Sequence, residues 1–372
     1  MGSVEFWHIM NILISCGGTG GHMFPGLSVA AELKSRGHNV TVLLSGRAVE
    51  NERSAKMIPD GVETCVLPAR QLKDPLLYLF LPYYLICGWR IFHRVRPAAL
   101  LAMGSYTSFV PCLTAFISRV PIVLHEANAV PGKAVKALSR FARTICYTFP
   151  GVTRFLPAKK RFWDTGVPLR AEMLGIKPHK AEKELTLLVM GGSQGAASVN
   201  VAIVEALSLL AERKPETGKR LRVIHIAGAR NEAAVRELYA KRPAGTISVT
   251  VIGFTNEMPK YYSEADLCIS RAGASSCFEL ALGGIPAILI PLTGLAGDHQ
   301  GANARYFEEQ GAVRVVSQRD LATPDALVAC LTELLENEES RDALRKAILP
   351  LARPDAAARV ANAIEAAARN ER

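Results

Sequence analysis

An apolar strand, a glycine-rich loop and a helix follow one another twice in this chain, and this repeat most constrains its fold. The first copy begins with NILISC at 11–16, continues through GGTGGH and leads to a predicted helix at 26–36. The second begins with ELTLLVM at 184–190, continues through GGSQGA and leads to a predicted helix at 198–213. Further apolar runs alternate with helical patterns, which is typical of βαβ units. The sequence therefore predicts an α/β protein with two Rossmann-like, doubly wound parallel-sheet domains.

The domain boundary is predicted in KKRFWDTGVPLR, where charge, glycine and proline accumulate. We expect one domain over 1–166 and a second over 167–353, with an Ala-rich helix at 354–372 that packs back onto the first. A length of 372 residues suits two domains of ordinary size. With 49% hydrophobic and 21% charged residues, the composition excludes a disordered chain, a collagen, a coiled coil and a polytopic membrane protein.

Eight cysteines are scattered along the chain without a C-x-x-C pair. This pattern predicts reduced thiols in a cytoplasmic protein, instead of a disulfide framework or a zinc site. We expect no secretory signal peptide, because the first strand begins near Asn11 and leads directly into the glycine loop.

The positive charge is confined to the first half of the chain. Residues 1–165 carry 19 Lys and Arg against 9 Asp and Glu, a net charge of +10, whereas residues 166–372 carry 25 of each sign. A one-sided basic domain indicates a polyanionic partner, either nucleic acid or an anionic membrane surface. Because no zinc-finger, RNA-recognition or helix-turn-helix signature is present, we expect an anionic membrane surface and no nucleic acid.

An apolar and aromatic segment, PLLYLFLPYYLICGW at 75–89, is bordered by cations. It is shorter than the roughly 20 residues that span a bilayer, and Pro82 is expected to interrupt it. Two interpretations remain open: a helix buried in the core, or a membrane-facing patch ringed by basic residues. The flanking cations are Lys73, Arg90, Arg94 and Arg96, and the patch would consist of Leu76, Leu79, Phe80, Tyr83 and Trp89.

The first glycine loop, GGTGGHMFPG at 17–26, fits neither of two common phosphate-binding patterns. A dinucleotide fingerprint requires glycine where Met23 stands, and a P-loop requires a lysine that is absent. Glycines still allow backbone N–H groups to approach a ligand, and a following helix N-terminus favours an anion. We therefore predict a phosphate or sugar cradle with His22 at its edge, where the alternative is a histidine that only packs.

Three later clusters are also candidates. GGSQGA at 191–196 predicts a second anion cradle. In RAGASSCFE, Ser276 and Glu279 have the spacing of a capping box, but Glu279 could instead accept the two hydroxyls of a ribose. DHQGAN at 298–303 follows a strand end, where ligands bind in such sheets. Because neither H-x-x-x-H nor D-x-D occurs, we expect no metal at this site.

Together and in this order, these motifs resemble the MurG family of N-acetylglucosaminyltransferases, which make lipid II for peptidoglycan. The resemblance also rests on LHEAN at 124–128 and GVPLR at 166–170, and it extends from residue 17 to 303. It implies the GT-B fold, in which two Rossmann-like domains face a cleft and the final helix returns to the first domain.

The resemblance implies inverting, metal-independent transfer of GlcNAc from UDP-GlcNAc to the 4-hydroxyl of MurNAc in lipid I, an undecaprenyl-diphosphate-linked MurNAc-pentapeptide. The reaction would need no cofactor and would take place at the cytoplasmic face of the cell membrane, with the enzyme bound peripherally. His22 would act as the general base, with Glu126 as the alternative.

The same resemblance assigns UDP-GlcNAc to residues of both domains. Glu279 would hold the ribose, Phe254 and Thr255 would contact the uracil, and Gln300 would hold sugar hydroxyls. The full predicted set is Thr19, Gly20, Gly21, Asn128, Arg170, Ser193, Phe254, Thr255, Ala274, Ser275, Glu279 and Gln300.

Two alternatives from other classes remain. A UDP-GlcNAc 2-epimerase could use the same fold, but it would be soluble and would need no apolar patch. A catalytically inert nucleotide-sugar-binding subunit could dock on a membrane partner, but damaged first-domain loops would then be expected, and the loop with His22 is intact.

Overall fold

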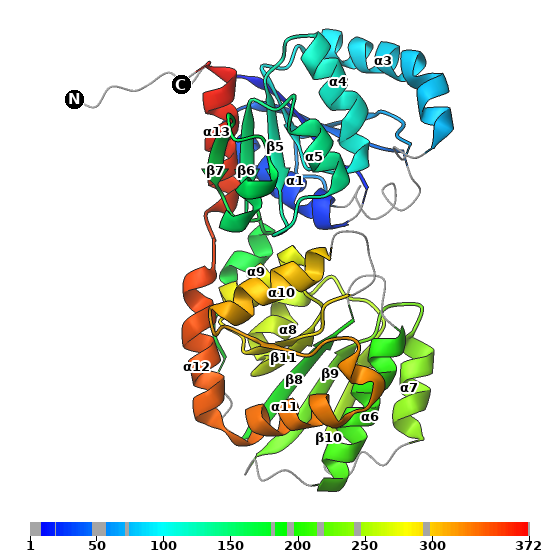
Figure 1. The fold of residues 1–372 in the computed structure, drawn as a ribbon, viewed down its shortest axis with the longest axis vertical. Helices are drawn as coiled ribbons and strands as arrows, with labels where there is room; N and C mark the ends of the chain where they lie inside the picture. The colour runs from blue at the N-terminus through cyan, green and yellow to red at the C-terminus, as the bar shows by residue number, and fades with distance from the viewer. Residues whose placement is uncertain are drawn as a thin grey trace, which may run out of the picture. The chain divides into compact units, whose positions relative to one another are not determined.

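The computed structural model describes residues 9–18, 20–46, 57–70, 74–179, 183–191, 197–213, 219–241, 247–292 and 298–370. The chain forms two compact units (Figure 1), one of residues 1–170 with 353–372 and the other of residues 171–352. Each unit contains one parallel sheet. The predicted α/β class with two doubly wound parallel sheets is therefore confirmed.

The first unit has a seven-stranded sheet in the order β3-β2-β1-β4-β5-β6-β7. Its strands are β1 (Asn11–Ser15), β2 (Asn39–Leu44), β3 (Glu63–Val66), β4 (Ala99–Ala102), β5 (Ile122–Glu126), β6 (Thr144–Tyr147) and β7 (Arg161–Asp164). Its principal helices are α1 (Gly20–Ser35), α3 (Pro75–Val95), α4 (Phe109–Ile117), α5 (Lys133–Leu138) and α13 (Ala356–Ala368).

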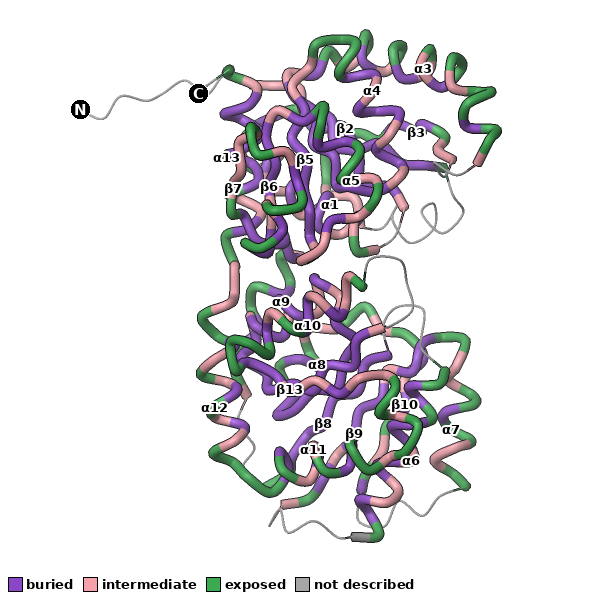
Figure 2. Tube along the Cα trace, viewed as in Figure 1, coloured by how far each residue is buried: buried purple, intermediate pink, exposed green. Residues whose placement is uncertain are grey.

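Both faces of this sheet are covered, as is usual for parallel sheets. On β1, Ile12 and Ile14 pack with residues of α1 and α13 on one face. Leu13, between them, packs on the other face with residues of α3, α4 and α5. Because successive strand side chains point to opposite faces, one apolar run supplies both cores. Figure 2 shows the strands as mostly buried.

The second unit has a six-stranded sheet in the order β10-β9-β8-β11-β12-β13. Its strands are β8 (Glu184–Met190), β9 (Arg220–Ile226), β10 (Ile247–Ile252), β11 (Leu267–Ser270), β12 (Ala287–Leu289) and β13 (Arg314–Val315). Its principal helices are α6 (Ala197–Arg213), α7 (Glu232–Ala240), α8 (Met258–Glu264), α9 (Ala274–Gly283), α10 (His299–Glu309), α11 (Asp325–Glu336) and α12 (Glu338–Ile348).

Both sheets reverse their strand order at an equivalent point, between β1 and β4 in the first unit and between β8 and β11 in the second. In open parallel sheets, ligands bind beyond the carboxyl ends of the strands at such a switch point. The first glycine loop follows β1 at this position, and Gly191, the first residue of the second glycine motif, follows β8, whereas residues 192–196 lie outside the described residues. The fold therefore places a candidate ligand-binding position in each unit, beyond the carboxyl ends of the central strands of its sheet.

Helix α1 begins six residues earlier than the sequence predicted, at Gly20 instead of Gly26. Pro25 lies inside the helix, where it removes one intrahelical hydrogen bond without ending it. Gly26 allows the helix to pack closely on the end of β1, since a Cβ there would lie 2.3 Å from the Cβ of Cys16. Gly20, Gly21 and His22 consequently belong to the first helical turn.

Two other expectations were wrong. The predicted interruption at Pro82 does not occur, because α3 continues through it as one 21-residue helix. The segment 159–170, in which the domain boundary was expected, contains β7, which pairs with β6 at the sheet edge, and the first unit ends at Arg170. This strand was not predicted because it contains charged residues. An edge strand exposes much of its surface and therefore lacks the apolar pattern of a buried strand.

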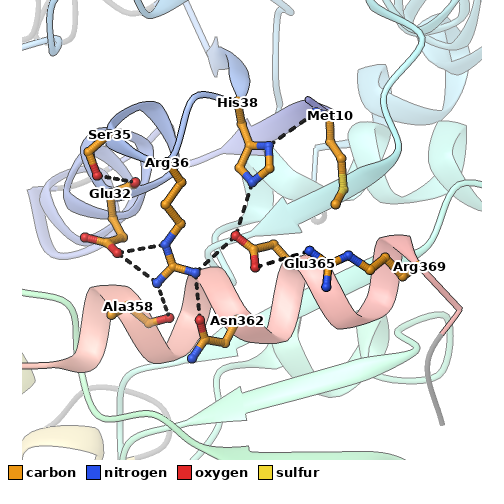
Figure 3. Close-up of polar contacts among 9 residues, drawn as sticks. All are labelled: Met10, Glu32, Ser35, Arg36, His38, Ala358, Asn362, Glu365 and Arg369. Carbon is orange, nitrogen blue, oxygen red and sulfur yellow. Dashed lines mark hydrogen bonds and ion pairs between the residues drawn. The ribbon is translucent and has the colours of Figure 1, made fainter. Parts of the chain in front are cut away.

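A buried polar cluster holds the returning helix α13 on the first unit (Figure 3). Glu365 of α13 accepts hydrogen bonds from Arg36 Nη1 at 3.0 Å and from His38 Nε2 at 3.1 Å. The backbone N–H of Met10 donates to His38 Nδ1 at 3.2 Å. Because Nδ1 accepts this bond, His38 is the neutral tautomer with its proton on Nε2. The carboxylate of Glu365 therefore joins helix α13 to Arg36 and His38, which lie between α1 and β2.

Candidate active site

The glycine loop after β1 is fastened to the loop after β4. Gly18 has a φ of +116°, and a Cβ there would lie 2.7 Å from Ser105 Oγ. Thr107 Oγ1 donates to the carbonyl of Gly17 at 2.8 Å. A side chain at position 18 would therefore strain the backbone and also collide with the neighbouring loop. These contacts fix the two loops at the switch point of the first sheet.

His22 is held in one tautomer. Its Nδ1 lies 2.6 Å from the carbonyl oxygen of Met103, and since a carbonyl can only accept, Nδ1 carries the proton. Burial lowers the pKa of His22, although the hydrogen bond to Met103 acts in the opposite direction. The ring is therefore neutral at pH 7, and Nε2 has an available lone pair. These are the properties of a general base.

Glu126, the alternative base, is buried and braces a loop. Its Oε1 accepts from the backbone N–H of Asn128 at 2.8 Å and from Asn128 Nδ2 at 3.1 Å. Its Oε2 accepts from the N–H of Gly132 at 3.1 Å. Both carboxylate oxygens are thus engaged in shaping the segment after β5. The geometry favours His22 as the base and gives Glu126 the task of orienting the Asn128 amide.

His125, which we did not predict as a site residue, connects β5 to the GVPLR motif. It is buried, and its Nε2 donates to the carbonyl of Gly166 at 2.9 Å. Burial lowers its pKa to about 4; the bond to Gly166 opposes this, and the neighbouring His22 adds to it. The signal in the sequence was a histidine at the end of an otherwise apolar strand. The neutral His125 side chain thus connects the LHEAN and GVPLR motifs by a hydrogen bond.

Arg170 lies at the point where the chain leaves the first unit. Its guanidinium carbon is 5.2 Å from the ring centroid of Phe24 in α1, a cation–π contact. This contact places a permanent cation beside the helix that carries His22.

The capping-box interpretation of Ser276 and Glu279 is wrong. Helix α9 begins at Ala274, with Gly273 as its N-cap and no side-chain cap hydrogen bond. Ser276 is therefore the third helical residue and Glu279 the sixth, beyond the first turn. Instead, Glu279 Oε2 accepts a hydrogen bond from the hydroxyl of Tyr262 at 2.8 Å. The N-terminus of α9 has N–H groups suited to an anion.

Buried polar side chains hold the turn before α9. Arg271 Nη1 donates to the carbonyl of Ile290 at 3.1 Å, and Asn303 Nδ2 donates to the carbonyl of Ala272 at 3.1 Å. Asn303 is fully buried in α10, so the DHQGAN motif supports the RAG turn directly. Gln300 Oε1 accepts from the N–H of Leu292 at 2.9 Å, and its amide nitrogen remains a donor.

The loop after β10 carries the two residues predicted to contact the base. Phe254 is 46% exposed. Thr255 Oγ1 accepts from the N–H of Glu257 at 2.9 Å, which stabilises the turn into α8. An exposed aromatic ring on a braced turn is suited to stacking against a planar base.

The predicted residues divide between the units. The first unit holds Gly20, Gly21, His22, Glu126, Asn128 and Arg170, and the second holds Phe254, Thr255, Ala274, Ser275, Glu279 and Gln300. Thr19 and Ser193 lie outside the described residues. Within the part of the chain that the structure describes, no group of three or more His, Cys, Asp or Glu side chains could hold a metal ion.

Helix α3 is not a core helix, so that interpretation of the apolar segment is wrong. Its buried residues are Leu77, Tyr84, Gly88 and Phe92, and its outward face is exposed (Figure 2). By length and composition α3 could cross a membrane, and 22% of its apolar window is buried. The exposed large apolar residues on α3 are Leu76, Tyr78, Leu79, Phe80, Tyr83, Ile86 and Trp89.

The exposed surface continues onto α4, which the sequence analysis missed. Phe116 and Ile117 at its end are 55% and 62% exposed. A hollow of about 230 Å³ lies along the contact between α3 and α4, and it is lined by Leu85, Ile86, Trp89, Thr114, Ile117 and Ser118. We call the exposed apolar residues of α3 with Phe116 and Ile117 the α3–α4 surface. Isolated exposed apolar residues are ordinary, whereas several exposed on neighbouring helices make this surface a candidate for interaction.

Two parallel sheets, each reversing its strand order at an equivalent switch point, are the architecture of GT-B glycosyltransferases, and the family comparisons support that class. Models of the glycosyltransferase family 28 N-terminal and C-terminal domains match residues 12–147 and 186–360. The chain belongs to glycosyltransferase family 28 and, within it, to the MurG family of N-acetylglucosamine transferases.

Individual relatives agree with this assignment. A protein of Pseudomonas savastanoi pv. phaseolicola, named UDP-N-acetylglucosamine--N-acetylmuramyl-(pentapeptide) pyrophosphoryl-undecaprenol N-acetylglucosamine transferase, is 35% identical over 95% of this chain and 97% of the relative. The crystal structure of Acinetobacter baumannii MurG has a TM-score of 0.76 at 29% identity, covering 95% of this chain and 98% of that one. A UDP-N-acetylglucosamine 2-epimerase structure, at a TM-score of 0.67 and 13% identity, covers 95% of this chain and 94% of its own. That likeness shows the shared fold alone and does not favour the epimerase alternative.

Proposed function

We propose that this chain transfers GlcNAc from UDP-GlcNAc to the 4-hydroxyl of MurNAc in undecaprenyl-diphosphate-linked MurNAc-pentapeptide, with inversion and without a metal. The observation that carries the proposal is the single tautomer of His22, which leaves Nε2 able to accept a proton at the switch point of the first sheet. Membership in the MurG family supports the choice of donor and acceptor.

In the proposed reaction, the acceptor 4-oxygen forms a bond to the anomeric carbon of GlcNAc while the bond from that carbon to the β-phosphate oxygen breaks. The hydroxyl proton passes to His22 Nε2, and UDP leaves with the electron pair of the broken bond. Because the attack and the departure occur on opposite faces of the sugar, the product has the β configuration. The developing charge on UDP is stabilised by preorganised N–H groups at helix N-termini and by Arg170.

Residues of the second unit would hold the donor. Phe254 and Thr255 would contact the uracil, and Glu279 would accept hydrogen bonds from the ribose hydroxyls. Ala274 and Ser275 would turn their backbone N–H groups toward the diphosphate at the N-terminus of α9. Gln300 would donate its amide hydrogens to sugar hydroxyls. From the first unit, Gly20, Gly21 and Asn128, together with Thr19, would contact the sugar. Ser193, in the second glycine motif, would contact the phosphates.

Release of UDP tests the class of reaction. A glycosyltransferase should release UDP from UDP-GlcNAc in proportion to the lipid I analogue supplied, and should form little UDP without it. An epimerase would produce UDP-ManNAc or ManNAc without any acceptor. Chromatography of the nucleotide and sugar products after incubation with and without the analogue separates these outcomes, and acceptor-independent epimerisation would contradict the proposal.

Changing Glu279 to Gln should raise the KM for UDP-GlcNAc by roughly tenfold or more, because a charge-assisted hydrogen bond contributes about 1.5–3 kcal/mol. The melting temperature should stay unchanged, since Glu279 does not cap α9. Steady-state kinetics and thermal unfolding are the measurements. A lower melting temperature with an unchanged KM would make Glu279 a structural residue only.

We further propose peripheral binding of the α3–α4 surface to the cytoplasmic face of the cell membrane. The apolar side chains would enter the boundary between headgroups and acyl chains, and the bordering cations Arg90, Arg94 and Arg96 would face anionic lipids. All three cations are exposed, whereas Lys73 lies outside the described residues. The net charge of +10 over residues 1–165 supports an anionic surface as the partner.

Binding to vesicles containing anionic lipid should weaken but not vanish as salt rises, because the electrostatic attraction is screened while the apolar contribution persists.

Changing Leu79 and Phe80 to Ser should reduce vesicle binding and turnover of lipid I together, while a soluble short-chain acceptor is still used. Leu174→Ser is the matched control, because Leu174 is 47% exposed on the second unit. Equal vesicle binding by the wild type and the double variant, measured by sedimentation, would contradict the membrane role.

A further inference from the structure

The Tyr262 side chain is buried in the core, and its hydroxyl contacts the carboxylate of Glu279. It is 1% exposed and is among the largest fully buried side chains of the described residues. Its hydroxyl donates to Glu279 Oε2 at 2.8 Å, from α8 to α9. A tyrosine side chain has few rotatable bonds, and here its ring is enclosed by packing. The hydroxyl is therefore a donor at a fixed position.

The helix that carries Tyr262 also begins at the proposed base-binding loop. The turn braced by Thr255 and Glu257 leads directly into α8, whose second residue is Pro259. Proline in the first turn has the backbone dihedral angle that a helix start requires. One short rigid segment thus connects the loop of Phe254 to the side chain that touches Glu279. The hydrogen bond from Tyr262 to Glu279 therefore holds two features in one fixed arrangement: the loop of Phe254, proposed to contact the base, and the carboxylate proposed to bind the ribose.

We propose that Tyr262 is a positioning residue that orients Glu279 toward the 2′- and 3′-hydroxyls of the donor ribose and so makes the site select ribonucleotides. This inference rests on the proposed donor nucleotide. A carboxylate can accept about four hydrogen bonds, so the bond from Tyr262 leaves capacity for two ribose hydroxyls. It also prevents the carboxylate from rotating away. A site built around such an acceptor rejects an analogue that lacks the hydroxyl, because its acceptor is then left without a donor.

The test is direct binding of UDP and 2′-deoxy-UDP by calorimetry to the wild type and to Tyr262→Phe. The variant should weaken UDP binding by roughly three- to tenfold, which is less than the full contribution of a hydrogen bond to a carboxylate, because Tyr262 acts through Glu279 and does not itself touch the nucleotide. It should weaken 2′-deoxy-UDP binding less, so that the preference for UDP falls. In the transfer assay, the KM for UDP-GlcNAc should rise with little change in kcat.

Two controls separate positioning from general damage. Tyr261→Phe removes a hydroxyl one residue away, and no hydrogen bond connects that hydroxyl to Glu279 in the described structure; this variant should bind both nucleotides like the wild type. In a Glu279→Gln background, Tyr262→Phe should add little, because the two residues act as one unit.

The inference is overturned if Tyr262→Phe leaves UDP binding unchanged, or if it weakens UDP and 2′-deoxy-UDP equally. A Tyr262→Phe protein that unfolds at assay temperature would also overturn it, because the hydroxyl would then serve stability. If the wild type binds UDP with the expected ribose preference but transfers no GlcNAc, the proposed function fails while this inference stands.

Discussion

Replacing His22 with alanine is expected to lower kcat for GlcNAc transfer by about 100-fold or more, with a smaller change in the KM for UDP-GlcNAc. The size follows from the usual contribution of a positioned general base. The structure supports the split between kcat and KM, because His22 lies at the switch point of the first unit, whereas the residues proposed for the ribose and base belong to the second. Single-turnover rates with a lipid I analogue measure the effect on chemistry.

The pH profile provides an independent check on His22. A general base is active when neutral, so the rate should fall as pH drops through its pKa. Because burial lowers the pKa of His22, this acid limb should lie below pH 6.5 in the wild type and should disappear in His22→Ala. His179→Ala is the matched control, since this side chain is 40% exposed on the second unit. Near-normal turnover of His22→Ala would reduce His22 to a packing residue.

Replacing Glu365 with leucine is expected to destabilise the first unit by about 3 kcal/mol, because the buried His38 and the partly buried Arg36 lose the carboxylate that they share. The Nε2–H of His38 would lose its acceptor, and Arg36 would lose one of its two carboxylate partners. For a unit of this size, that corresponds to a fall in melting temperature of roughly 6–12 °C. Faster hydrogen exchange should be concentrated in α13, whose anchor is removed (Figure 3).

Glu32→Gln is the matched control for this prediction. Glu32 pairs with the same guanidinium at 2.8 Å but is 31% exposed, and exposed ion pairs typically contribute less than about 1 kcal/mol. Its melting temperature should therefore stay close to that of the wild type. If Glu32→Gln and Glu365→Leu lower the melting temperature equally, the buried cluster does not anchor the helix.

The sequence was informative wherever burial on both faces imposed a continuous apolar run. Glu184–Met190 was predicted as a strand with the bounds that β8 has in the structure, and the bounds predicted for β1 differ by one residue. Short edge strands were not predicted, because β3 and β7 carry charged residues and are half exposed. The pattern of alternating elements fixed the class of fold, but it could not show where each sheet ends.

Local rules failed where tertiary packing decided the outcome. The first helix was expected to begin after Pro25, and Pro82 was expected to interrupt the apolar segment. Each proline instead lies inside a helix that is stabilised by packing against its own unit. The spacing of Ser276 and Glu279 matched a capping box, but the helix begins two residues before Ser276. Spacing alone does not reveal which residue starts a helix, and glycine at 273 supplies an N-cap without a side chain.

Contacts between distant segments were also beyond the sequence. Tyr262 is seventeen residues from Glu279, and nothing in either motif pairs them. His125 of β5 is hydrogen-bonded to Gly166, which follows β7 and is forty-one residues away in the sequence. The motifs indicated which segments carry the candidate site residues, whereas the residues that hold those segments in place became visible only in the folded chain.

The most direct measurement is the transfer of radiolabelled GlcNAc from UDP-GlcNAc to a lipid I analogue, with and without EDTA. The account predicts a labelled lipid product containing a β-1,4-linked disaccharide, formed at the same rate in both conditions. The same product should form very slowly with His22→Ala. No labelled lipid product from the folded wild type, or a rate that EDTA abolishes, would contradict it.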